Sequence, residues 1–208
     1  MTPDLSVYLV TEPLVGLDDV VGAAVAGGAG IVQLRDKTAT TRELAAAVTR
    51  LRPVTAARGV PLVVNDDVEA ARFADGVHVG ASDVPPAVVR AELGPDAVVG
   101  WSVNDVAQLD DDAAVAACTY LAVSPVWATG TKPDHEPPLG LDGVRAVVER
   151  VAGRRPVVGI GGIDATNAHE VVAAGAAGVA VVTAITRSPD PAEAARALRA
   201  AVDRGRSA

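Results

Sequence analysis

Eight short runs rich in β-branched residues recur along the chain, separated by Ala-rich segments of helical composition. Runs of this length are typical of buried strands, and their alternation with helices is typical of parallel strands joined by crossover connections. The expected strands cover residues 7–11, 31–35, 62–65, 76–80, 98–102, 120–124, 157–160 and 178–182. The pattern therefore predicts an α/β fold.

The number of units separates the two architectures that fit this alternation, a closed (β/α)8 barrel and an open doubly wound sheet. Eight units in 208 residues average 26 residues each, which is close to the minimum for a strand, its crossover helix and two short loops. A count of eight at this length favours closure. We predict a single (β/α)8 TIM barrel that spans residues 1–208 as one domain.

Composition narrows the class of ligand and the cellular setting. A net charge of -8 argues against a nucleic-acid partner, because binding to phosphate backbones requires a basic surface. No apolar run approaches the roughly 20 residues that span a bilayer, and the first ten residues lack the features of a secretory signal. We expect a cytoplasmic protein without a membrane partner, in which the single Cys118 is a buried small hydrophobe. The oligomeric state stays open, with a homo-oligomer as one option.

Polar residues follow most of the expected strands at their C-terminal ends, where the active sites of such barrels lie. In chain order they are Gln33, Arg35, Lys37, Asn65, Asp66, Asp67, Asp83, Ser102, Asn104, Thr129, Thr131 and Lys132. The last three belong to residues 124–140, the longest irregular segment, and segments of that length are often functional. Because the strand ends meet at one mouth, we expect these side chains to converge there.

Lysine usage indicates an anionic ligand at this mouth. Lys37 and Lys132 are the only lysines among 18 basic residues, and both fall in strand-end loops. A compact ammonium group suits a phosphate oxygen differently from a planar guanidinium. Two lysines and Arg35 facing one cavity in an acidic protein favour a phosphate or diphosphate ligand.

Asp66 and Asp83 are the candidate ligands of a divalent cation, since they follow two neighbouring expected strands. Mg2+ prefers one or two carboxylates together with waters and substrate phosphates. In the alternative interpretation, Asp66 caps a helix and Asp83 forms a turn. Asp67 is the better candidate for the helix cap.

Two loops near the end of the chain predict a second phosphate site. Glycine and small residues follow the seventh and eighth expected strands, and in (β/α)8 barrels the loops at these positions often hold a phosphate through backbone N–H groups. No nucleophile or acid–base pair stands out, and the position of His78 within a strand is more typical of a packed residue. Cations, a metal and a second phosphate suit group transfer.

Taken together, these segments resemble the thiamine-phosphate synthase family from end to end. The motifs QLRDK, VNDDVEAA, ADGVHVGASD, VGWS, TGTKPD, PVVGIGGI and GVAVVTAI occur in the order found in the family. The resemblance implies a transferase that joins 4-amino-5-hydroxymethyl-2-methylpyrimidine diphosphate to a thiazole phosphate with the help of Mg2+, giving thiamine phosphate and diphosphate. It also implies a dissociative substitution, in which C–O cleavage leaves a pyrimidine methylene cation that the thiazole nitrogen attacks.

The resemblance further implies roles for individual residues. By similarity, the catalytic residues are Arg35, Lys37, Ser102 and Lys132, and the metal ligands are Asp66 and Asp83. The residues implied to bind the pyrimidine diphosphate are Gln33, Arg35, Lys37, Asn65, Ser102 and Lys132, with Leu34 and Asp36 in the same segment. Those implied to bind the thiazole phosphate are Thr129, Thr131, Gly162, Val182 and Thr183, with Gly130 between the two threonines.

Three positions depart from the pattern usual in the family, because Ala81 replaces a common Gln, Ser124 a common Gly and Thr183 a common Ser. Thr183 keeps a hydroxyl, so the departures concern fine placement. One rival function is a thiazole tautomerase, whose relatives usually carry a histidine in the sixth-strand loop, where this chain has Pro125 and Val126. A second rival, a non-catalytic phosphate-binding barrel, is disfavoured because every candidate charged group is present.

Overall fold

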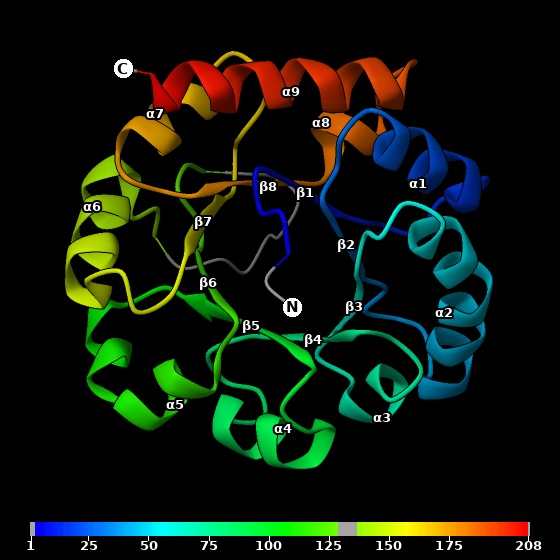
Figure 1. Cartoon of the computed structure of the whole chain (residues 1–208), viewed down its shortest axis with the longest axis horizontal. Coiled ribbons are helices and arrows are strands. Elements are labelled where there is room, and N and C mark those ends of the chain that lie inside the picture. Colours follow the sequence, from blue (N-terminus) through cyan, green and yellow to red (C-terminus); the bar gives the residue numbers. More distant parts are fainter. Residues whose placement is uncertain (1–2, 129–136, 208) are drawn as a thin grey trace.

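Eight parallel strands close into a barrel in the computed structural model, which describes residues 3–128 and 137–207 (Figure 1). Each strand pairs with the next one in the chain, and β1 pairs with β8, so the ring is closed. The strands are β1 (Val7–Val10), β2 (Ile31–Leu34), β3 (Leu62–Asn65), β4 (Gly76–Val79), β5 (Val98–Val103), β6 (Tyr120–Val123), β7 (Val157–Ile160) and β8 (Gly178–Val181). The closed barrel is confirmed, and the open sheet is excluded.

Helices alternate with the strands and form the outer ring of the molecule (Figure 1). They are α1 (Leu17–Ala26), α2 (Thr41–Ala56), α3 (Val68–Ala71), α4 (Pro86–Leu93), the 3-10 helix η1 (Val106–Asp110), α5 (Asp112–Ala117), α6 (Gly140–Val151), α7 (Ala168–Ala173), α8 (Thr183–Thr186) and α9 (Pro191–Arg206). The local sequence determines where several helices begin. Thr40 and Glu43 form a capping box at the start of α2, and Asp190 caps α9 just before the proline in its first turn. Of the helices in the described ranges, none is long and apolar enough to cross a membrane.

Two apolar layers hold the barrel together. One lies between strands and helices and contains outward-facing residues such as Leu9, Leu34 and Val64. The other fills the barrel interior and contains Leu5, Tyr8, Val10, Ile31, Val63, Val98, Tyr120, Ala122, Val158 and Ala180. Side chains alternate along a strand. Gln33 and Arg35 therefore point to the inside of the barrel and its mouth, whereas Leu34 packs between the barrel and the helices.

Cys118 lies in the layer between barrel and helices, as predicted for a buried small hydrophobe. Its Sγ donates to the carbonyl oxygen of Ala114 at 3.1 Å. Burial raises the pKa of the thiol to about 12, so the nucleophilic thiolate is scarce at neutral pH. Cys118 therefore has a packing role.

Candidate active site

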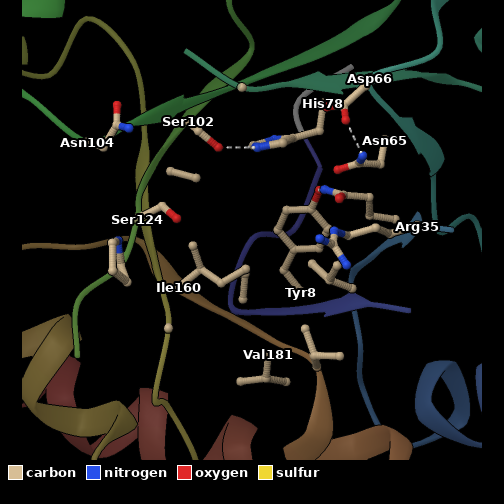
Figure 2. Close-up of a pocket in the computed structure, with 18 of the residues that line it drawn as sticks. Tyr8, Arg35, Asn65, Asp66, His78, Ser102, Asn104, Ser124, Ile160 and Val181 are labelled. Carbon is tan, nitrogen blue, oxygen red and sulfur yellow. Dashed lines mark hydrogen bonds between the residues drawn. The ribbon is translucent and has the colours of Figure 1, made fainter. Parts of the chain in front are cut away.

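A cavity of about 460 Å³ opens at the C-terminal ends of the strands (Figure 2). Its lining includes Tyr8, Val10, Gln33, Arg35, Lys37, Asn65, Asp66, His78, Ala81, Asp83, Ser102, Asn104, Ser124, Gly162, Val182 and Thr183. The predicted convergence of polar side chains on one mouth is confirmed for the described part of the chain except Asp67, which is not among the lining residues. Thr129, Gly130, Thr131 and Lys132 lie outside the described residues, so their roles stay predictions.

Asp66 occupies the centre of the charged side of this cavity. Its backbone is left-handed, with a φ of 62°, a conformation that costs free energy in a residue with a Cβ and that clusters at functional sites. Asn65 Nδ2 donates to Asp66 Oδ2 at 2.6 Å (Figure 2), and Lys37 Nζ donates to the same oxygen. The Asp83 carboxyl lies within hydrogen-bonding reach of the Asp66 carboxyl. Two carboxyl groups that follow β3 and β4 thus meet beside one ammonium group.

The surroundings of Asp66 disfavour its negative charge. Burial raises the pKa of Asp66 above its usual value of 3.8, and Asp83 raises it further, while Lys37 opposes the rise. A divalent cation between the two carboxylates would remove their repulsion. Within residues 3–128 and 137–207, no group of three or more His, Cys, Asp or Glu side chains is placed to hold a metal. Two carboxylates beside an open cavity fit Mg2+, which prefers one or two carboxylates together with waters and phosphates.

The neighbouring Asp67 caps the next helix and leaves Asp66 to the cavity. Asp67 Oδ1 accepts from the backbone N–H of Ala70 at 2.8 Å, at the start of α3, and the Thr41 hydroxyl donates to Oδ2 at 2.7 Å. The predicted cap is therefore confirmed. Asp83 also makes the turn of the alternative interpretation, since its Oδ2 accepts from the Gly80 N–H at 2.7 Å. Asp83 therefore both forms the turn and lines the cavity.

The segment after β2 presents alternate side chains to the cavity. Arg35 and Lys37 line it, whereas Leu34 is buried in the layer between barrel and helices. Asp36 is not among the lining residues either, and its Oδ1 accepts from the hydroxyl and the backbone N–H of Thr38 at 2.7 and 2.9 Å. These two bonds lower the pKa of Asp36. The geometry gives no support to side-chain contacts between substrate and Leu34 or Asp36, and Asp36 instead shapes the loop.

A row of hydrogen bonds that the sequence does not reveal crosses the floor of the cavity. Gln33 Nε2 donates to the Tyr8 hydroxyl at 2.5 Å, the hydroxyls of Tyr8 and Tyr120 are 2.7 Å apart, and His78 Nδ1 is 3.0 Å from the Tyr120 hydroxyl. His78 Nε2 lies 2.9 Å from Ser102 Oγ (Figure 2). We call these five residues the polar network. His78 is buried, as predicted, and it also lines the cavity.

Loops rich in glycine and small residues line the cavity beside β7 and β8. Gly161 and Gly162 follow β7 with φ of 106° and 67°, and Val182 and Thr183 lead from β8 into the short helix α8. Asn167 Nδ2 donates to the Gly162 carbonyl oxygen at 2.9 Å and holds the first of these loops. Loops at this place in a (β/α)8 barrel commonly bind phosphate through backbone N–H groups. The predicted residues Gly162, Val182 and Thr183 are thus brought together.

The raised pKa of Asp66 predicts how the stability of the ligand-free protein depends on pH. Because the folded pKa lies above the usual 3.8, the stabilising contribution of this group is complete below that value and is lost as pH rises through the folded pKa. Asp66→Asn removes the ionisable group. We expect its free energy of unfolding, measured by urea titration without Mg2+, to exceed that of the wild type at pH 7 and to approach it at low pH. A variant less stable than the wild type at pH 7 would contradict this account.

Comparisons with known proteins identify the family. The family model described as thiamine monophosphate synthase matches residues 7–185. The thiamine-phosphate synthase of Natronomonas pharaonis is 50% identical over 214 residues, which cover 98% of this chain and 97% of that protein. The thiamine-phosphate synthase of Roseiflexus sp. (strain RS-1) is 44% identical over 202 residues, which cover 94% of this chain and 84% of that protein.

Structural comparison agrees with the sequence comparison. The solved structure of a thiamine phosphate pyrophosphorylase from Pyrococcus furiosus matches this fold with a TM-score of 0.85 at 32% sequence identity, covering 98% of each chain. A native KDPGal structure matches with a TM-score of 0.71 at 14% identity and shows the shared barrel alone. The family match spans most of the chain, and relatives under one name cover nearly all of it. The chain therefore belongs to the thiamine monophosphate synthase family and is a transferase.

Proposed function

We propose that this transferase joins 4-amino-5-hydroxymethyl-2-methylpyrimidine diphosphate to a thiazole phosphate, giving thiamine phosphate and diphosphate with the help of Mg2+. The observation that carries the proposal is the division of one cavity into two anion-binding sides. Arg35, Lys37 and the Asp66–Asp83 pair line one side, and the glycine-rich loop after β7 and the small residues after β8 line the other. We also propose a cytoplasmic location and small-molecule ligands without a nucleic-acid partner, since a net charge of -8 disfavours binding to phosphate backbones.

The diphosphate belongs on the side of β2, β3 and β4. Arg35 and Lys37 bring positive charge to that side, and Ser102 brings a hydroxyl from β5. When bound by Asp66 and Asp83, Mg2+ would supply further neutralisation of the diphosphate charge. Lys132, whose position in the sequence follows β6, is proposed as a third cation on the same group.

The thiazole phosphate belongs on the side of β7 and β8. Gly162, Val182 and Thr183 line the cavity there, and backbone N–H groups suit a phosphate dianion without needing another cation. Thr129 and Thr131, with Gly130 between them, are proposed as further contacts from the segment after β6. The two substrates would then face each other across the cavity.

The reaction proposed for this arrangement is a dissociative substitution. The bond between the pyrimidine methylene carbon and the diphosphate oxygen breaks, and its electron pair leaves with the diphosphate. The thiazole nitrogen then forms the new C–N bond with its lone pair, so no proton has to be removed. The tasks left to Arg35, Lys37 and Ser102 are to place the two reactants and to offset charge on the leaving group.

The experiment incubates the purified protein and Mg2+ either with both substrates or with a thiazole carboxylate phosphate alone, and compares the products. We expect thiamine phosphate when both substrates are present. A thiazole tautomerase would instead isomerise a thiazole carboxylate phosphate alone, and a non-catalytic barrel would bind the phosphates and form no product. Either of those results, without thiamine phosphate formation, would contradict the proposal.

A further inference from the structure

The polar network links groups from five strands of the barrel. It begins at Gln33 on β2, passes through Tyr8 on β1 to Tyr120 on β6, and ends with His78 on β4 and Ser102 on β5, with heavy-atom distances from 2.5 to 3.0 Å. All but Tyr120 line the cavity. Tyr120 is fully buried, so any effect it has on a ligand must pass through its neighbours.

We assign the direction of the hydrogen bonds from the chemistry of the groups. Gln33 Nε2 can only donate, so the Tyr8 oxygen accepts there and its own proton is left for Tyr120. Burial raises the pKa of both phenols, so each keeps its single proton. Tyr120 has accepted from Tyr8 and therefore donates to His78 Nδ1. A bare Nδ1 places the ring proton on Nε2, which then donates to Ser102 Oγ.

Gly100 leaves the space that this arrangement needs. On the paired strands β4, β5 and β6, His78, Gly100 and Tyr120 are direct neighbours in register. A Cβ at Gly100 would lie 2.2 Å from Tyr120 Cζ, 2.3 Å from its hydroxyl and 2.4 Å from His78 Nδ1. Any side chain at this position would therefore displace the bond between Tyr120 and His78.

We propose that Tyr120 is a positioning residue that holds His78 in the neutral tautomer protonated at Nε2. Because Ser102 Oγ then accepts from His78, the Ser102 hydroxyl proton is directed into the cavity, as a donor to an oxygen of the departing diphosphate. A hydroxyl that accepts one hydrogen bond becomes a stronger donor in the next, because linked hydrogen bonds polarise one another. The catalytic part of this inference rests on the proposed function, whereas the tautomer does not depend on it.

The first test observes the tautomer directly by 15N NMR of protein labelled in its histidine rings. The chain has three histidines, and a His78→Gln variant assigns the pair of signals from His78. We expect a protonated Nε2 and a bare Nδ1 in the wild type, and loss of this single form in Tyr120→Phe. A wild-type His78 that carries its proton on Nδ1, or a Tyr120→Phe spectrum identical to the wild type, would overturn the proposal.

The second test measures the effect on turnover. Tyr120→Phe should lower kcat roughly tenfold, as expected for one hydrogen bond of ordinary strength, and leave the KM for the thiazole phosphate unchanged. Since Tyr120 acts through Ser102, the variant with both Tyr120→Phe and Ser102→Ala should be no slower than Ser102→Ala. If the loss of kcat in the double variant equalled the product of the two single losses, the proposal would be overturned.

Val63→Ala is the matched control, because Val63 belongs to the same interior layer, is fully buried and has no polar group. It should reduce stability and leave both the His78 signals and kcat at wild-type values. A loss of kcat in Val63→Ala equal to that in Tyr120→Phe would assign the effect to packing and overturn the positioning role. The expected wild-type tautomer in a protein that forms no thiamine phosphate would instead contradict the proposed function alone.

Discussion

Replacing Asp66 with asparagine is expected to lower kcat for thiamine phosphate formation by about a hundredfold to a thousandfold. Asparagine keeps the size of the side chain and tolerates the left-handed φ of 62° at this position, so the change removes a charge at little cost to the backbone. Under the proposed function, the pair with Asp83 would then bind Mg2+ weakly, and the departing diphosphate would keep more of its negative charge. The measurement is kcat over a range of Mg2+ concentrations.

Asp67→Asn is the matched control, since it makes the same change one residue away. Asparagine caps helices about as well as aspartate, and the Asp67 carboxylate caps α3. This variant should therefore keep the wild-type kcat and the wild-type response to Mg2+. Equal losses in Asp66→Asn and Asp67→Asn, or no loss in Asp66→Asn, would show that Asp66 is not a metal ligand.

The second large effect is expected at the phosphate loop, where Gly162→Ala should raise the KM for the thiazole phosphate about a hundredfold. Gly162 has a φ of +67°, and a Cβ there would lie 2.9 Å from Trp127 Cβ and 3.1 Å from the Ala128 carbonyl oxygen. The backbone must shift to relieve both the strain and the crowding, which would move the N–H groups that are proposed to bind the phosphate. The KM for the pyrimidine diphosphate should stay near its wild-type value.

Gly153→Ala is the control that introduces backbone strain at a position away from the cavity. Gly153 has a similar φ of +75°, but nothing lies within 4 Å of a Cβ there, and it lies between α6 and β7, at the end of the barrel away from the cavity. We expect about 1 kcal/mol lower stability and wild-type kinetics. If both variants keep the wild-type KM for the thiazole phosphate, the loop after β7 does not bind this phosphate.

Much of the fold is predictable from the sequence, because each strand is a compact apolar run and several of the helices, such as α2, α5 and α9, begin at a side-chain cap. The exact ends of the strands are harder to predict. The expected strands include Thr11 and Arg35, yet these residues lie just beyond β1 and β2. There the Arg35 N–H donates to Thr11 Oγ1 at 3.0 Å, so a side chain replaces the backbone ladder, and composition does not reveal that exchange.

The charged side of the site is predictable for the same reason as the barrel. Parallel strands end at one mouth, so residues just past several strands must meet, and Arg35, Lys37, Asp66 and Asp83 do so. Leu34, which the family resemblance includes, has its side chain in the layer between barrel and helices. Side chains on a strand alternate, and one residue of the motif necessarily faces the helices.

The polar network could not be predicted from the sequence because it depends on contacts between distant strands. Tyr8 and Tyr120 each stand within an apolar run, and a period of two indicates only that they face the interior. Their hydroxyls meet across the barrel, from β1 to β6, 112 residues apart in sequence. Gly100 was the available signal, since a glycine inside a strand often marks a close approach of neighbouring groups.

The measurement that tests the central claim most directly is the simultaneous assay of diphosphate and thiamine phosphate, with purified protein, both substrates and Mg2+. The account predicts equal amounts of the two products, no thiamine phosphate when either substrate is omitted, and loss of both products with EDTA. Asp83→Ala and Lys132→Ala should form both products far more slowly. Undiminished product formation in EDTA or in these two variants would contradict the assignment of the site, and the absence of thiamine phosphate under all conditions would contradict the function itself.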